Sequence, residues 1–161
     1  MYRIGEQVIH RSIGLCEVVT ISELDFGNGG EYYTLVPARD SKEKVYVAVK
    51  NADRTLRPVM TREEAEEIFM CLQDKSIDWN DNNRVRDEQF KQQLRSGSSL
   101  TWAVMLKNLY RMRCRKQSLG QKLSASDTAH LNRSASLLVG ELAAVLETTP
   151  EEIYRRIEAY Q

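Results

Sequence analysis

The sequence predicts an α+β protein, with a small, strongly bent sheet or barrel in residues 1–60 and a compact all-α region in residues 61–161. Two observations support this division. The first sixty residues contain short runs rich in β-branched and aromatic residues, separated by turns, as in small β-barrels. Beyond residue 60, apolar residues recur instead at the three- and four-residue spacing of amphipathic helices.

Four strands are expected in the first sixty residues. They start with the apolar pair Val8-Ile9 and continue over residues 15–21, 32–36 and 45–49. The segment Gly27-Asn28-Gly29-Gly30 lies between the second and third strands and lacks the Lys and Ser/Thr of a phosphate-binding loop. Because Gly and Asn tolerate positive φ, this segment predicts a hairpin turn.

The helical region begins with a capping box, in which Thr61 is followed three residues later by Glu64. A linker helix is expected over residues 61–74, and the polar stretch near residues 75–83 predicts a hinge. The remaining helices are expected over 84–95, over 100–115, from Ser124 through Leu146, and after Thr149-Pro150. Trp102 lies in an apolar helical stripe, which predicts core packing.

The composition favours a soluble binding protein over an enzyme. Hydrophobic residues make up 42% of the chain, which is enough for a core. Neither a signal peptide nor a membrane span is expected, so the chain is expected in the cytoplasm. Cys16, Cys71 and Cys114 are expected as free thiols, and no catalytic or metal-binding motif appears. We therefore expect no catalysis, no metal and no cofactor.

The charge distribution points to an anionic partner. Residues 81–123 carry ten basic and three acidic side chains in a chain whose net charge is zero. On two consecutive helices, such residues could contact phosphates without reading base sequence. The alternative is an ordinary solvated helix face. The basic residues are Arg84, Arg86, Lys91, Arg95, Lys107, Arg111, Arg113, Arg115, Lys116 and Lys122.

Trp79 is a large apolar residue in a run of Asp and Asn. In such a position, tryptophan either covers the junction of two modules or serves as an exposed contact residue. An exposed aromatic ring beside basic helices could insert against a base step in the minor groove. The residue types alone leave both interpretations open.

Several short motifs, taken in order, resemble the CarD/CdnL family of bacterial RNA polymerase-binding transcription regulators. The match covers nearly the whole chain. Its pieces are Ile4–Ile9 with Gly14, similar to the family's opening "GDxVVYPxHG"; Asn51-Ala52-Asp53 with Leu56-Arg57; Trp79-Asn80; the Ser96-Gly97 break; Leu123-Ser124; and Leu138–Ala143, similar to "LVGELA".

The resemblance implies a Tudor-like N-terminal barrel that binds the RNA polymerase β subunit, and a helical domain that contacts promoter duplex or fork DNA largely independently of sequence. Such a protein would be associated with the nucleoid, with no membrane contact and no small-molecule substrate. The tryptophan of the family's "WN" motif wedges into the minor groove and helps to hold the open complex; here it would be Trp79. The DNA-contacting residues expected are Trp79, Arg84, Arg86, Lys91, Arg113, Arg115 and Lys116. The polymerase-contacting residues expected are Leu24, Tyr33, Tyr46 and Val47.

Two other functions fit the sequence. One is a protein-interaction module whose basic helices face an acidic protein surface and which does not bind DNA directly. The other is an RNA-binding protein whose barrel stacks bases on Tyr32, Tyr33 or Tyr46. Salt-sensitive binding to duplex DNA would count against the first. A preference for single-stranded RNA over forked DNA would favour the second.

Overall fold

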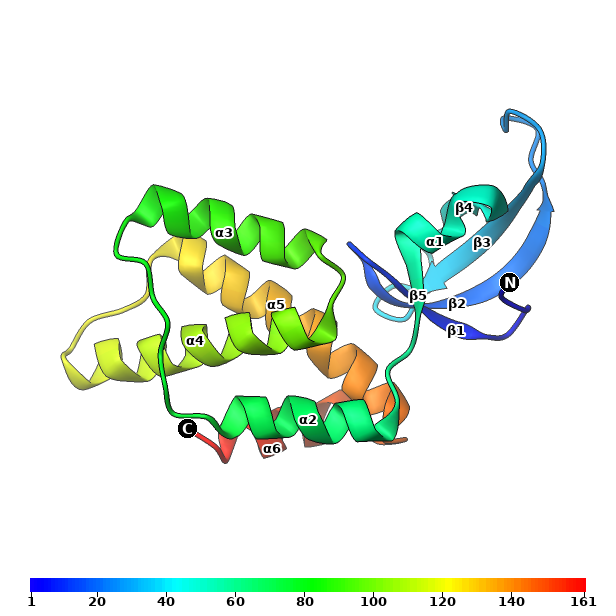
Figure 1. Cartoon of the computed structure of the whole chain (residues 1–161). Coiled ribbons are helices and arrows are strands. Elements are labelled where there is room, and N and C mark those ends of the chain that lie inside the picture. Colours follow the sequence, from blue (N-terminus) through cyan, green and yellow to red (C-terminus); the bar gives the residue numbers. More distant parts are fainter. The chain divides into compact units, whose positions relative to one another are not determined.

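Five antiparallel strands form the first of two units, Met1–Val59, in the computed structural model, which describes residues 1–161. The strand order in the sheet is β4-β3-β2-β1-β5, and Figure 1 shows the strongly curved β2 and β3 in blue. β4 and β5 are therefore the edge strands. The strands are β1 (Gln7–His10), β2 (Gly14–Glu23), β3 (Glu31–Pro37), β4 (Val45–Ala48) and β5 (Leu56–Pro58).

Alternation of apolar residues builds the core of this sheet. Side chains from all five strands, including Val8, Val18 and Leu35, are almost fully buried. The register between β2 and β3 shifts between Val18 and Thr20, and such a bulge bends a long strand. The predicted hairpin lies between β2 and β3, with positive φ at Gly29 and Gly30.

The sheet contains one strand more than the sequence analysis expected. After β4 the chain forms a 3-10 helix, η1 (Val49–Asn51), a single helical turn, α1 (Ala52–Thr55), and then β5. β5 pairs with β1, so that Ile9 faces Arg57 in the ladder. Three residues are too few to show an alternating pattern, which explains why the sequence did not predict this strand.

The second unit, Met60–Gln161, is entirely helical, and the predicted α+β class is confirmed. Figure 1 shows α5 crossing behind α4, with α6 beside α2 at the bottom of this unit. Trp102 is fully buried, as predicted. The helices are α2 (Arg62–Gln73), α3 (Asn83–Arg95), α4 (Ser99–Ser118), α5 (Ala125–Val145) and α6 (Pro150–Glu158).

Both helix starts that the sequence marks most clearly are capped as predicted. Thr61 Oγ1 accepts a hydrogen bond from the Glu64 amide, and the Glu64 carboxylate accepts one from the Thr61 amide. The Thr149 hydroxyl accepts one from the Glu152 amide at the start of α6. None of the helices is long and apolar enough to cross a lipid bilayer.

The glutamate of the "LVGELA" motif anchors the beginning of this unit. Glu141, on α5, is fully buried, and its Oε1 accepts a hydrogen bond of 2.8 Å from the backbone amide of Met60. A buried carboxylate requires such partners, because its desolvation is otherwise costly. The contact ties the start of the unit to a residue 81 positions later in the chain.

Candidate functional site

The segment between α2 and α3, which contains Trp79, is held from one side by polar residues of α4. Asn108 Oδ1 accepts a hydrogen bond of 3.0 Å from the Asp78 amide. Lys107 Nζ lies 3.3 Å from an oxygen of Asp74 and 3.2 Å from Ser76 Oγ. Both α4 side chains are buried, so these bonds are shielded from water.

Arg111 contributes a second set of contacts from the same helix. Its guanidinium donates to the carbonyl oxygens of Leu72, Asp74 and Tyr160 at 3.0, 3.2 and 2.8 Å. The sequence alone suggests that Lys107 and Arg111 are surface cations. The structure differs, since only 7% and 8% of these residues is exposed and both bind backbone or side-chain oxygens of the chain itself.

The Asp74 carboxylate is the acceptor at the start of this segment. Hydrogen bonds from the amide and the hydroxyl of Ser76, and from Lys107, lower the pKa of Asp74 from 3.8 to about 2. A carboxylate that accepts several hydrogen bonds is stabilised in its charged form. Asp74 is therefore an ionised anchor at any ordinary pH.

Arg86 holds the other end of the segment. Its guanidinium makes a bidentate pair with Asp127 of α5, at 3.0 and 2.8 Å. It also donates to the Asn80 carbonyl at 2.8 Å and to Asn83 Oδ1 at 2.9 Å. Only 6% of Arg86 and 3% of Asp127 is exposed. Arg86, expected as a DNA contact, is thus fully engaged inside the unit and positions the segment instead.

The Trp79 side chain is half-buried, so it is neither fully covered nor freely exposed. The Arg86 guanidinium lies 4.5 Å from the centre of its ring. Its edge meets Phe90, with ring centres 6.0 Å apart and planes inclined by 62°. These contacts fix the orientation of the ring while leaving part of it open to a partner.

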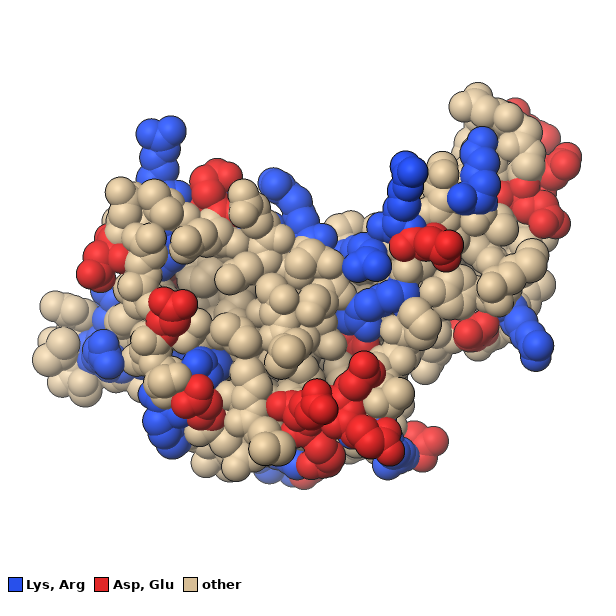
Figure 2. Space-filling model, in the orientation of Figure 1, with Lys and Arg blue, Asp and Glu red and all other residues tan.

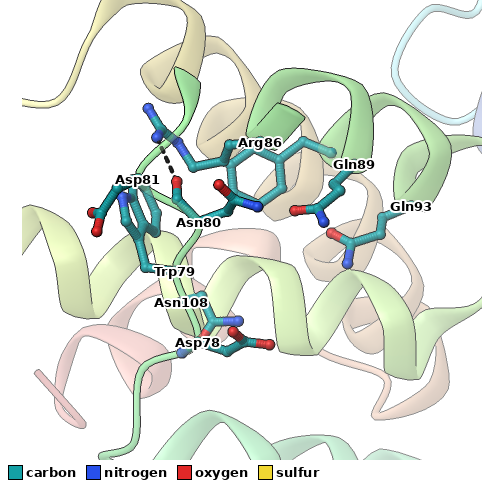
Figure 3. Close-up of a pocket in the computed structure, with 9 residues that line it drawn as sticks. Asp78, Trp79, Asn80, Asp81, Arg86, Gln89, Gln93 and Asn108 are labelled. Carbon is teal, nitrogen blue, oxygen red and sulfur yellow. Dashed lines mark hydrogen bonds between the residues drawn. The ribbon is translucent and has the colours of Figure 1, made fainter. Parts of the chain in front are cut away.

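A cavity of about 370 Å³ opens beside Trp79 (Figure 3). Figure 3 shows Gln89 and Gln93 approaching it from α3, opposite Asp78 and Asn108. Polar side chains dominate its lining, and Phe90 and Trp79 supply the apolar part. The lining residues are Asp78, Trp79, Asn80, Asp81, Arg86, Gln89, Phe90, Gln93 and Asn108.

A polar cluster around Asp87 lies between α3 and α5. Asp87 accepts hydrogen bonds from His130 and Ser126, both at 2.7 Å, and pairs with Lys91 at 2.9 Å. Hydrogen bonds from His130, Lys91 and Ser126 hold the pKa of Asp87 well below its ordinary value. Ser126 donates to Asp87 rather than to His130, so the cluster does not form the nucleophile–base pair of a hydrolase.

The remaining basic residues differ in solvent exposure and in their contacts within the chain. Arg84 and Arg115 are exposed and Lys116 is half-exposed. Lys91 is held by Asp87, and Asp87 raises its pKa. Arg113 stacks on Tyr110, with its guanidinium carbon 4.7 Å from the ring centre. Figure 2 shows basic side chains over α3 and the end of α4, whereas acidic ones gather over α2.

The expected polymerase contacts also differ in exposure. Only 1% of Tyr33 and 6% of Val47 is exposed, and both belong to the core of the sheet. They cannot reach a partner directly, because alternate residues of a strand face opposite sides. Tyr46 is 43% exposed and Leu24 is half-exposed, so these two lie where a partner can contact them.

Phe26 was not identified from the sequence, because it precedes a Gly-rich turn that dominates the local pattern. It is 69% exposed, and its ring lies 5.3 Å from that of Tyr46 in an edge-to-face arrangement. A large apolar residue next to a turn is a signal that sequence reasoning could have used. Gln93 and Asn108 were missed because only tertiary structure brings them to the cavity.

No three His, Cys, Asp or Glu side chains converge on a place that could hold a metal ion. The helical unit carries instead an oriented tryptophan, a polar cavity and exposed arginines. The sheet unit separately carries an exposed aromatic pair. This combination is typical of a binding protein that contacts macromolecules.

Comparison with known families supports the same class. Residues 2–60 match the CarD-like/TRCF RID domain, and residues 67–158 match the CarD C-terminal domain. No curated protein matches the chain significantly. The two matches define an RNA polymerase-interacting protein of transcription. The chain belongs to the CarD-like family, whose members are non-enzymatic transcription factors.

Proposed function

We propose that residues 1–60 bind the β subunit of RNA polymerase, while residues 61–161 contact promoter DNA at the upstream edge of the melted bubble and thereby modulate the stability of the open complex. The observation that carries this proposal is the way Trp79 is held. Asn108 fixes the backbone on one side of it and Arg86 on the other, and part of the ring remains uncovered.

A pre-oriented ring suits a wedge. An apolar side chain that inserts between base steps unstacks them, which costs free energy that other contacts must offset. If the ring were mobile, ordering it on binding would add to that cost. Arg86 and Phe90 keep Trp79 in one orientation before DNA arrives. A protein that binds melted promoter DNA better than closed DNA shifts the population toward the melted form.

The exposed cations support a contact that does not depend on base sequence. Arg84, Arg115 and Lys116 are expected DNA-contacting cations that are not buried, pair with no carboxylate and do not stack on a ring of the chain as Arg113 does. If three such residues contact phosphates, the logarithm of the binding constant should fall with the logarithm of salt concentration with a slope of about −3. Fluorescence anisotropy of the full chain on a labelled DNA fork measures this slope. Binding that does not respond to salt would contradict the proposal, and tighter binding to single-stranded RNA would favour the RNA-binding alternative.

The sheet unit offers a surface for the polymerase. β4 is an edge strand, whose outer backbone groups can pair with an extended segment of a partner. The exposed Phe26–Tyr46 pair lies beside this edge, and exposed aromatic residues are common anchors of protein interfaces. Tyr33 of β3 pairs with Val47 of β4, and both side chains pack in the core beneath this edge strand. The buried position of Tyr33 also removes one of the rings that an RNA-stacking platform would need.

Capture of the polymerase β subunit by the full chain tests this part of the proposal. Replacing Phe26 and Tyr46 by alanine should reduce capture by at least about tenfold, because central aromatic anchors are often worth more than 1–2 kcal/mol. Met70→Ala is the control, since Met70 is an exposed apolar residue of the helical unit. Unchanged capture by the double variant would move the polymerase contact elsewhere.

A further inference from the structure

We propose that the cavity beside Trp79 is a nucleobase subsite, which receives the edge of one unpaired base next to the fork junction. This inference rests on the proposed DNA contact of the helical unit and adds a specific ligand to it. The cavity volume of about 370 Å³ lies within the usual range of small-molecule pockets, about 300–1,000 Å³.

Four carboxamide side chains line this one cavity: those of Asn80, Gln89, Gln93 and Asn108. Figure 3 shows them arranged around a common space, with Gln89 and Gln93 on one side and Asn80 and Asn108 on the other. Asparagine and glutamine read base edges because each carboxamide carries both a donor and an acceptor. Their convergence therefore favours a ligand that carries both kinds of group.

One of these groups has a buried oxygen atom without a hydrogen-bond partner. The Oε1 atom of Gln93 is shielded from solvent and accepts no hydrogen bond within the chain. Buried polar atoms in folded proteins nearly always have a partner, so an unpaired one requires an explanation. Turning the Gln93 carboxamide about its last side-chain bond would bring this oxygen to the cavity, where a donor group of a bound base would supply the missing hydrogen bond.

Two of the other carboxamides have their oxygens occupied. Asn108 Oδ1 accepts from the Asp78 amide, and Asn80 Oδ1 accepts from the Asn82 amide. Their NH2 groups are thus the parts left to face a ligand. The cavity therefore combines an acceptor, on Gln93, with donors, on Asn80 and Asn108, and this matches a base edge with both donor and acceptor positions.

The charges of the lining argue against a phosphate, and its hydrogen-bonding groups argue against a cationic side chain. Asp78 and Asp81 would repel a phosphate, and the positive charge of Arg86 is matched by its pair with Asp127. A lysine or arginine side chain of a protein partner has only donors. It would leave the carboxamide NH2 groups without acceptors. An uncharged base is the occupant that uses both kinds of group.

Trp79 explains how a base could reach the cavity. A wedge that opens a base step leaves the neighbouring base unstacked, and an unpaired base can turn out of the helix at low cost. The cavity adjoins the ring, and Phe90 adds an apolar wall beside it. The same element would thus open the step and hold the displaced base.

Binding of the full chain to DNA forks with abasic sites tests the proposal. A set of forks carries a tetrahydrofuran residue at each unpaired position next to the junction in turn. For wild-type protein, one of these positions should weaken binding roughly tenfold, as expected for the loss of one recognised base. Gln93→Leu should bind all forks equally and unfold at the same denaturant concentration as wild type. Gln89→Leu, at a more exposed position, is a second variant, and Gln73→Leu on α2 is the control.

The outcomes separate this proposal from the proposed function. If wild type binds abasic and intact forks equally, while binding still depends on salt and on Trp79, the subsite is wrong and the DNA contact stands. If no fork is bound at all, both are overturned. If Gln93→Leu weakens capture of the polymerase without DNA and leaves fork binding unchanged, the cavity takes a protein side chain and the base subsite is refuted.

Discussion

Replacing Arg86 by methionine would leave the Asp127 carboxylate buried without its partner. Arg86 and Asp127 are 6% and 3% exposed, and two hydrogen bonds of 3.0 and 2.8 Å join them. Breaking a buried ion pair by removing one partner typically costs about 3–5 kcal/mol. That is a large part of the roughly 5–15 kcal/mol of a typical domain. We therefore expect Arg86→Met to destabilise the helical unit strongly.

Both tryptophans, Trp79 and Trp102, lie in the helical unit, so their fluorescence reports on its unfolding in urea. Arg84→Met is the matched control, because Arg84 is exposed two residues earlier and no ion pair involves it. It should change the unfolding free energy by less than about 0.5 kcal/mol. The double variant Arg86→Met/Asp127→Leu should regain most of the loss, because apolar replacements of buried pairs are often neutral.

The opposite result would refute this assignment. If Arg86→Met unfolded at the wild-type urea concentration and lost only DNA affinity, Arg86 would be a phosphate contact, as the sequence alone suggested. The comparison of Arg86→Met with Arg84→Met, for both unfolding free energy and DNA affinity, therefore decides between the two roles of Arg86. Arg86 should govern stability and Arg84 should govern DNA affinity.

Arg84→Glu should weaken fork binding about equally for all sequences and reduce the salt slope by about 1, measured by anisotropy; a loss confined to one sequence would contradict this. The pKa of Asp74 is lowered from 3.8 to about 2, so its contribution to stability is present above pH 3.8 and is lost as the pH falls toward 2. Between pH 3.8 and 2, the unfolding free energy measured in urea should depend less on pH in Asp74→Asn than in wild type. The same pH dependence in both proteins would show that Asp74 does not stabilise the fold as an ionised acceptor. Glu141→Ala should cost about 1–3 kcal/mol, because it leaves the buried Met60 amide unpaired, whereas Glu141→Gln should cost less; equal losses would show that the carboxylate charge matters more than the hydrogen bond.

The sequence was most informative where structure depends on neighbouring residues. Helix caps and tight turns involve residues only a few positions apart, so the local sequence predicts them. Examples are the caps at Thr61 and Thr149 and the hairpin with Gly29 and Gly30. Burial of Trp102 followed from helical spacing. The sequence did not predict β5, because its three residues form a strand only by pairing with β1, which lies far earlier in the chain.

The candidate site was harder to predict because its parts meet through tertiary contacts. From the charge distribution alone, Arg86 is expected to be a surface cation. Its partner Asp127 lies 41 residues later in the chain, so the local sequence does not indicate the ion pair. Lys107 likewise binds Asp74, 33 residues earlier. Tyr33 was expected at an interface, but the pleat of β3 turns it into the core. Charge and aromatic content identified the region of the site without showing which side chains face outward.

The lifetime of open promoter complexes tests the central claim most directly. Polymerase and promoter DNA are incubated with the wild-type chain or with Trp79→Ala, and the decay of heparin-resistant complexes is followed, with Arg84→Met and Met70→Ala as additional variants. We predict that Trp79→Ala binds polymerase normally, unfolds close to the wild-type urea concentration and gives shorter-lived open complexes than wild type. An unchanged lifetime with full polymerase binding would contradict the wedge role of Trp79 and the proposed action on the melted promoter.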